Sequence, residues 1–370
     1  MRPGLIGYVR ILAAALTTMA PMAMASSLDP AALPGIWKGS IGRQPVVACF
    51  NRSDTYGAEG SYYYLKHLVP ISIEFDASNK ALKEADGVWN VDLATESTLT
   101  GSWKKKDGAG ATPISLTRVG AADPKACGSD AFVASLEAPS APRVVTGPRS
   151  DFNGHGYRTL SGLNQATIQI LLPGAAADTI NRDLRAVIDD SGKAVAEYNE
   201  RRRNDLATRG IVMDDENNVS PSFWSDRYLS INFYSWAAGM GASGISSYDL
   251  TWDLATGKRV DLWQWFGVER EQATDNSATM PARLLAKFVK PSDVPPADDN
   301  CAANYTGEVP FRISLTATGM QFNQWPRGDG CDLDFAADFD ALLPYMTADG
   351  RAAVKAITSS RKWHAGVISQ

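Results

Sequence analysis

Apolar and polar residues alternate most regularly between residues 228 and 254 of the 370-residue chain. Leu229, Ile231 and Phe233 are separated by polar or aromatic residues, and this period of two is typical of a strand with one buried face. A second alternating run covers residues 248–254, and a glycine-rich segment at 239–244 lies between the two runs. Because glycine adopts the backbone angles that tight turns require, we predict a central antiparallel hairpin here.

The first third of the chain predicts a series of short strands. The triplet G-x-W occurs at residues 35–37, 87–89 and 101–103, and apolar-rich runs occupy 45–50, 61–67 and 69–75. We therefore predict a β-rich meander module over residues 26–137. Tyr62, Tyr63 and Tyr64 cannot all point to the same side of a strand, so we expect Tyr63 or one of its neighbours to be exposed.

Residues 138–150 are rich in proline and small residues, which predicts a linker. A strand at 166–173 follows, and from Ala175 to Tyr198 apolar residues recur at helical spacing, with Gly192 inside the segment. A further helix is expected over residues 278–289. The predicted fold class is therefore α+β: an N-terminal β-rich meander module, then an α+β domain over residues 151–370 with an antiparallel sheet and two or three helices.

The N-terminus has the pattern of a secretory signal peptide over residues 1–25. Arg2 and Arg10 flank an apolar run at 11–20 that is too short to span a bilayer, and A-M-A at 23–25 matches a small-x-small cleavage site. We expect cleavage after Ala25 and a periplasmic or secreted protein without a membrane span.

The net charge is −5 and becomes more negative when the two arginines of residues 1–25 are removed. Clustered Lys and Arg are needed to neutralise phosphates, so we predict no nucleic acid partner. An acidic surface suits a basic protein partner, or serves solubility alone.

The four cysteines, an even number in an exported chain, predict disulfides. Cys49, Cys127, Cys301 and Cys331 allow three pairings, of which 49–127 with 301–331 keeps each bridge within one half of the chain. No C-x-x-C pair is present, which argues against zinc. The three histidines are far apart in the sequence, and the acidic residues near 298–299 and 332–340 lack EF-hand spacing, so we predict no metal and no cofactor.

The chain has none of the motifs that announce nucleophilic or metal catalysis. It contains no G-x-S-x-G and no H-E-x-x-H, and its two S-x-x-K matches, at 102–105 and 359–362, lack companion motifs. Aromatic residues crowd the central hairpin instead, and exposed rings would bind sugars or anchor a protein partner. The candidate ligand-binding residues are Trp224, Tyr234, Trp236 and Ser243. For Trp236 a position in the core is the alternative, which its apolar neighbours favour.

Several short motifs of the C-terminal half occur in the order seen in one known family. They are Y-L-S-I at 228–231, G-A-S-G at 241–244, D-L-A-T-G-K at 253–258, D-L-W-Q-W-F at 261–266, F-R-I-S-L-T at 311–316 and F-D-A-L-L-P-Y at 339–345. Over residues 160–358 the chain resembles the extracytoplasmic domain of the lysozyme-sensing anti-sigma factor RsiV and of related envelope proteins of unknown function. The resemblance implies a lysozyme-like or peptidoglycan-related partner. Ser243 stands where the family has a histidine, so a role that needs an imidazole does not carry over.

These observations lead to one main functional hypothesis, an exported, non-enzymatic envelope protein that binds a protein or a cell-wall ligand. One alternative is an exported hydrolase that acts on cell-wall glycan through acidic residues. The other is a purely structural envelope module. A concave pocket with two facing carboxylates would favour the hydrolase, and a flat aromatic patch would favour the binding protein.

Overall fold

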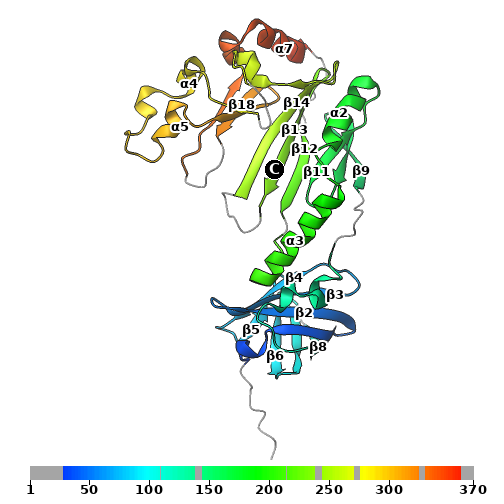
Figure 1. Cartoon of the computed structure of the whole chain (residues 1–370). Coiled ribbons are helices and arrows are strands. Elements are labelled where there is room, and N and C mark those ends of the chain that lie inside the picture. The colour runs from blue at the N-terminus through cyan, green and yellow to red at the C-terminus, as the bar shows by residue number, and fades with distance from the viewer. Residues whose placement is uncertain are drawn as a thin grey trace, which may run out of the picture.

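The computed structural model shows an N-terminal β-barrel followed by three smaller antiparallel sheets and several helices (Figure 1). It describes residues 28–108, 110–137, 144–213, 215–237, 244–270, 276–324 and 330–359. The predicted signal peptide, residues 1–25, lies outside the described residues. The mixed architecture confirms the predicted α+β class.

Eight antiparallel strands form the barrel, each paired with the next, and the last strand pairs with the first. This arrangement confirms the meander predicted from the G-x-W repeats. The strands are β1 (Gly35–Ile41), β2 (Gln44–Ser53), β3 (Gly57–Tyr64), β4 (Ile71–Asp76), β5 (Ala81–Lys83), β6 (Gly87–Ala94), β7 (Thr98–Lys105) and β8 (Ala111–Val119).

Large side chains pack the inside of the barrel, among them Trp37, Tyr62 and Trp89. Tyr64 is partly exposed, as expected for one residue of this run. Tyr63 points to the outside of the barrel, yet it is only 1% exposed, like Tyr62 on the inside. The reason is tertiary: the outer side of β3 is covered by the 3₁₀ helix η2 (Ala126–Gly128), the short helix α1 (Asp130–Val133) and the end of helix α3 (Gly192–Arg209). A strand covered on both sides needs no polar face.

After the barrel, a three-stranded sheet has the order β11-β10-β9. Its strands are β9 (Val145–Phe152), β10 (His155–Ser161) and β11 (Ala166–Ile170). Residues 145–150 were predicted as linker and instead form most of β9. Pro148 is compatible with this strand because β9 lies at the sheet edge, and the register with β10 shifts at this point. The remaining predicted linker residues, 138–143, lie outside the described part.

The segment predicted as one long helix forms two, α2 (Ala175–Arg185) and α3 (Gly192–Arg209). Polar residues between them end the first helix and start the second. Asp189 Oδ1 accepts a hydrogen bond from Ser191 N at 3.0 Å, and Ser191 Oγ accepts one from Ala194 N at 3.2 Å as the N-cap of α3. Gly192 is therefore the first residue of a helix rather than a weak point inside one.

The central sheet confirms the predicted hairpin strands. It has the order β12 (Glu216–Trp224), β13 (Tyr228–Trp236), β14 (Ile245–Asp253) and β15 (Arg259–Val260), all antiparallel. Leu229, Ile231 and Phe233 lie on the face that packs against α2 and β11. The opposite face carries the polar residues described below.

The last sheet has the order β16 (Ser277–Ala278), β17 (Phe311–Leu315), β18 (Gly319–Gln324) and β19 (Asp334–Asp338). The helix expected over 278–289 is shorter, α4 (Ala282–Phe288), because residues 277–278 pair with β17 and Pro281 stands at the helix start. The remaining helices are α5 (Ala302–Thr306), α6 (Phe339–Leu342) and α7 (Ala348–Ser359). None of the described helices is long and apolar enough to cross a membrane.

Helix α3 connects the two halves, since its C-terminal end docks on the barrel (Figure 1). Asn51 Nδ2 of β2 donates to Leu206 O at 2.7 Å and to Ala207 O at 3.2 Å, and Asn51 Oδ1 accepts from Cys127 N at 3.0 Å. Ser61 Oγ of β3 donates to Gly210 O at 2.7 Å. A buried polar interface therefore holds α3 to the barrel, while the domain division at residues 138–150 stays a prediction.

The structure pairs the cysteines as Cys49–Cys127 and Cys301–Cys331, the local pairing. The first bridge joins β2 to η2 beneath α3, and the second joins the start of α5 to the segment before β19. Two disulfides are consistent with an exported protein.

Candidate functional site

The polar face of the central sheet is the candidate functional site. Asn232, Tyr234 and Trp236 lie on the same side of β13, because side chains two residues apart in a strand share a face. Opposite them on β14, Ser247 pairs with Tyr234 and Asp249 pairs with Asn232. All five side chains are partly buried, so the face combines solvent contact with a fixed arrangement.

Asp249 is the centre of the hydrogen bonds on this face. Its Oδ2 accepts from Asn232 Nδ2 at 3.2 Å, and its Oδ1 accepts from Ser222 Oγ of β12. Asn232 Nδ2 also donates to Ser247 Oγ at 3.1 Å. Burial raises the pKa of Asp249, and this effect outweighs the hydrogen bonds from Ser222 and Asn232 and the positive charge of Arg312, which lower it.

Arg312 reaches this face from the neighbouring sheet. It lies on β17, is 3% exposed, and its NH1 donates to the backbone oxygen of Ser247. The two sheets thus meet beside Asp249, and a guanidinium from one sheet helps to fix the polar face of the other.

A pocket of about 250 Å³ opens beside Asp249. Its polar lining residues are Asp249, Thr251, Arg259, Asp261, Arg270 and Asn276. Most of these charges are engaged: Asp261 Oδ2 lies 2.9 Å from Arg270 Nε, and Asp261 Oδ1 accepts from Trp263 N at 3.0 Å. Arg259 donates to both carboxylate oxygens of Asp183, at 2.6 and 3.1 Å. The pocket therefore holds two carboxylates in different environments: Asp261 is paired with Arg270, and Asp249 is bonded to Ser222 and Asn232 with the charge of Arg312 nearby.

The predicted binding residues fall into three groups. Tyr234 and Trp236 lie on the polar face and keep exposed surface. Trp224 is 2% exposed and stacks on the ring of His155, with 4.9 Å between the ring centroids, so in this conformation it offers no ring to a ligand. Ser243 lies outside the described residues.

Sequence reasoning missed Asn232, Asp249 and Ser222 as members of this site. The only sign of them in the sequence was that polar residues occur at alternate positions of β13 and β14. The same pattern is typical of any strand with one face in water. What distinguishes these residues is contact with β12 and β17, which the sequence pattern does not contain.

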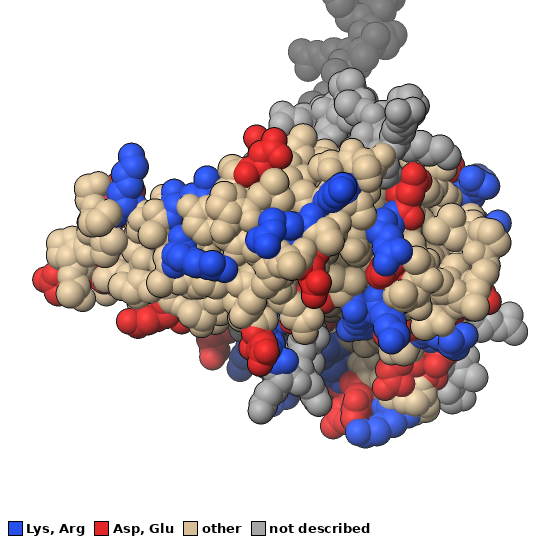
Figure 2. All heavy atoms as spheres, turned by 90° about the horizontal axis from the view of Figure 1, so that it is seen from above, with Lys and Arg blue, Asp and Glu red and all other residues tan. Residues whose placement is uncertain are grey.

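Charge is mixed on the surface around the upper helices. Figure 2 shows Lys and Arg interspersed with Asp and Glu on the face seen from above, without a large area of one sign. A partner of this face would therefore be recognised by local groups rather than by a uniform field. In the described residues, no three His, Cys, Asp or Glu side chains are placed to hold a metal ion together.

Comparison with known proteins gives only a distant structural likeness. No known protein family profile and no curated protein matches it. Among solved structures, it is similar to a member of the DUF3298 family from Bacteroides fragilis, with 13% sequence identity and a TM-score of 0.37 over 60% of this chain and 96% of that chain. The function of that family is unknown, and the structural likeness is distant. The resemblance to the RsiV domain stays a prediction.

Proposed function

We propose that this chain is an exported, non-enzymatic envelope protein that binds a protein or a cell-wall ligand through the polar face of its central sheet. The observation that carries the proposal is the presence of two partly exposed aromatic residues, Tyr234 and Trp236, beside the hydrogen-bonded pair Asn232–Asp249. Aromatic rings supply contact area with little loss of side-chain entropy, and the amide and carboxylate supply directed hydrogen bonds.

The partner class follows from the chemistry of this face and from the sequence resemblance. A glycan of peptidoglycan would stack its sugar rings on the aromatic residues, and its hydroxyl groups would donate hydrogen bonds to Asp249. A basic protein such as a lysozyme would bring cationic side chains to the same carboxylate. The net charge of −5 favours such a basic partner over an acidic one.

The test is binding of the mature chain, from Ser26, to two probes: immobilised lysozyme, and purified peptidoglycan sacculi by co-sedimentation. Trp236→Ala and Tyr234→Ala should each weaken binding to the probe that binds by about 2 kcal/mol, or roughly thirty-fold. Tyr56→Ala is the matched control, because Tyr56 is an aromatic residue of the barrel that is 48% exposed.

The proposal is contradicted if the wild-type chain binds neither probe. It is equally contradicted if both variants bind as tightly as the Tyr56→Ala control. Thermal melting of each variant separates a binding defect from unfolding, since loss of a core Trp would cost about 3–5 kcal/mol.

One observation favours the hydrolase as a second candidate, namely the pocket that contains both Asp249 and Asp261. A carboxyl with a raised pKa beside an ionised carboxylate is the arrangement of acid and base in glycan hydrolysis. Against it, Asp261 is held by Arg270 and by Trp263 N. Release of reducing ends from peptidoglycan by the wild type, abolished in Asp249→Asn, would support the hydrolase, and its absence in the wild type would exclude this route.

A further inference from the structure

Strand β19 forms a free edge of the last sheet, since it pairs with β18 on one side only. Phe339 N donates to Thr318 O at 2.9 Å, and Gln324 N donates to Leu333 O at 3.0 Å. In an antiparallel pair, residues alternate between those that bond to the partner strand and those that bond away from it. Leu333, Phe335 and Ala337 therefore bond to β18.

The other residues of β19 direct their backbone groups away from the sheet. Asp334 and Ala336 present both N–H and C=O to the free edge, and Asp338 presents its N–H. In the parts of the chain that the structure describes, no backbone hydrogen bond reaches these outward groups. Natural proteins usually shield such an edge with short strands, charged residues, proline or a bulge. β19 is short and carries Asp334 and Asp338, but it contains no proline and no bulge in its register with β18.

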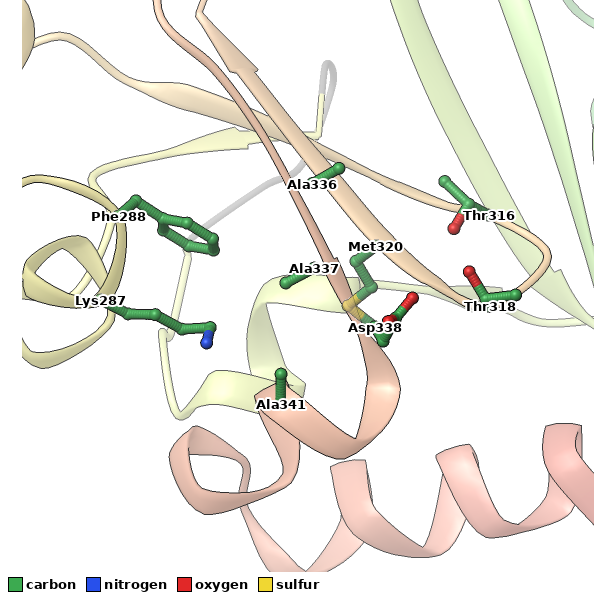
Figure 3. Close-up of a pocket in the computed structure, with 9 residues that line it drawn as sticks. All are labelled: Lys287, Phe288, Thr316, Thr318, Met320, Ala336, Ala337, Asp338 and Ala341. Atoms are coloured by element: carbon green, nitrogen blue, oxygen red, sulfur yellow. The ribbon is translucent and has the colours of Figure 1, made fainter.

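A groove of about 400 Å³ is lined by residues 336–338 at the end of β19, and it extends to Met320 of β18 and to Thr316 and Thr318 of the turn before it. Figure 3 shows Ala336, Ala337 and Ala341 along its middle, with Lys287 and Phe288 of α4 on one side and Asp338 and Thr318 on the other. The small alanine side chains leave room next to the backbone of β19. An added strand needs this room, because neighbouring strands lie about 4.8 Å apart.

The side chains on the two faces of β19 differ in chemistry. Asp334, Ala336 and Asp338 share the exposed side of β19, whereas Phe335 and Ala337 share the side that packs on the hydrophobic core. Phe288 stacks on Phe335 on that second side, with 4.8 Å between ring centroids. A strand added here would thus place alternate residues beside two carboxylates and beside apolar groups.

Negative charge is concentrated on the exposed face of β19, which carries Asp334 and Asp338. Burial and the neighbouring charge of Asp332 raise the pKa of Asp334. A second copy of β19 would bring its own aspartates against these, and like charges on paired strands repel. Lys287 of α4 also lines the groove, on the side opposite Asp338, with its ammonium group directed into the groove (Figure 3).

We propose that the free edge of β19 and the groove beside it bind an extended polypeptide segment of alternating basic and apolar residues, which adds to the sheet as a further strand. Backbone hydrogen bonds to Asp334, Ala336 and Asp338 supply the affinity. The aspartates select basic side chains, and Phe288 and Ala337 select apolar ones. This site is separate from the polar face of the central sheet and does not depend on it.

The probe is a fluorescently labelled ten-residue peptide of alternating lysine and valine, and its binding to the mature chain is followed by fluorescence anisotropy. Ala336→Pro removes the outward N–H of residue 336 and leaves the bonds between β19 and β18 in place, so it should weaken binding at least ten-fold. The double change Asp334→Asn with Asp338→Asn should weaken binding and reduce its salt dependence. Asp54→Asn with Asp107→Asn, two exposed acids of the barrel, is the matched control and should bind as the wild type does.

A second peptide separates strand addition from charge attraction alone. It has the same sequence, but every second backbone nitrogen, on the edge that would pair with β19, carries a methyl group. Because these nitrogens can no longer donate hydrogen bonds, this peptide should bind at least ten-fold more weakly. Equal binding of the two peptides, or unchanged binding by folded Ala336→Pro, overturns the proposal. If Ala336→Pro does not fold, the methylated peptide and the double aspartate variant decide alone. A wild-type dimer that becomes a monomer in Ala336→Pro would overturn it in favour of a second copy of this chain.

Discussion

Replacing Asn51 with alanine should uncouple α3 from the barrel. Asn51 is 3% exposed and makes three hydrogen bonds to backbone groups that are far from it in the sequence: Leu206 O, Ala207 O and Cys127 N. Alanine fills part of the space but offers neither donor nor acceptor, so these groups lose their partner inside a buried interface.

The size of the effect follows from the three bonds. A buried donor or acceptor left without a partner costs about 1–3 kcal/mol. The bonds to Leu206 O and Cys127 N are buried and count fully, whereas the one to Ala207 O is longer, at 3.2 Å, and only partly buried. We therefore expect Asn51→Ala to lower the free energy of unfolding by about 3 kcal/mol.

Urea unfolding followed by circular dichroism measures this change. Asn79→Ala is the matched control, because Asn79 lies in an exposed turn of the same barrel and bonds only to Asp76 among the described residues. Its free energy of unfolding should fall by less than about 0.5 kcal/mol. If Asn51→Ala unfolds at the same urea concentration as this control, the contacts of Asn51 do not hold α3 on the barrel and the account of that interface is wrong.

Three further predictions concern the bridges, the polar face and the end of α3. The mature chain should show no free thiols, and Cys301→Ser with Cys331→Ser should cost about 3–4 kcal/mol, since the bridge closes a loop with a sequence separation of 30. Folding raises the pKa of Asp249, so its carboxylate destabilises the folded state at neutral pH and this penalty fades as the pH falls toward the ordinary pKa of aspartate. Urea unfolding should therefore show that Asp249→Asn raises the free energy of unfolding, relative to the wild type, by more at pH 7 than at pH 5. A difference between the two proteins that does not depend on pH would contradict the raised pKa. Gly210→Ala should cost more than about 1 kcal/mol in the same assay, because Gly210 has φ 72° and a Cβ there would lie 2.7 Å from Glu59 O; an unchanged midpoint would refute this.

The sequence predicted those parts of the fold that depend on local periodicity. Alternation located β13 and β14, and the G-x-W repeats indicated the barrel strands, because both patterns record which face of a strand is buried. It failed where burial comes from distant segments. Tyr63 is buried because α1 and α3 cover the outside of the barrel, and no pattern within β3 contains that information.

The candidate site shows the same division. Tyr234 and Trp236 were predicted from residue type and position in the hairpin. Asp249 was not, because a carboxylate at an alternate strand position looks like a solvated one. Its surroundings come from Ser222 on β12, which is separated from Asp249 by strand β13, and from Arg312, on a different sheet. Sequence spacing alone gives no sign that these groups meet.

Hydrogen–deuterium exchange of the whole mature chain, with and without the probe that binds it, tests the central claim most directly. If the polar face of the central sheet binds the ligand, the amides of residues 228–236 and 245–253 should exchange more slowly in the complex, while those of the barrel strands stay unchanged. Slower exchange confined to the barrel, or to the edge at residues 334–338, with no change in the central sheet, would contradict the claim.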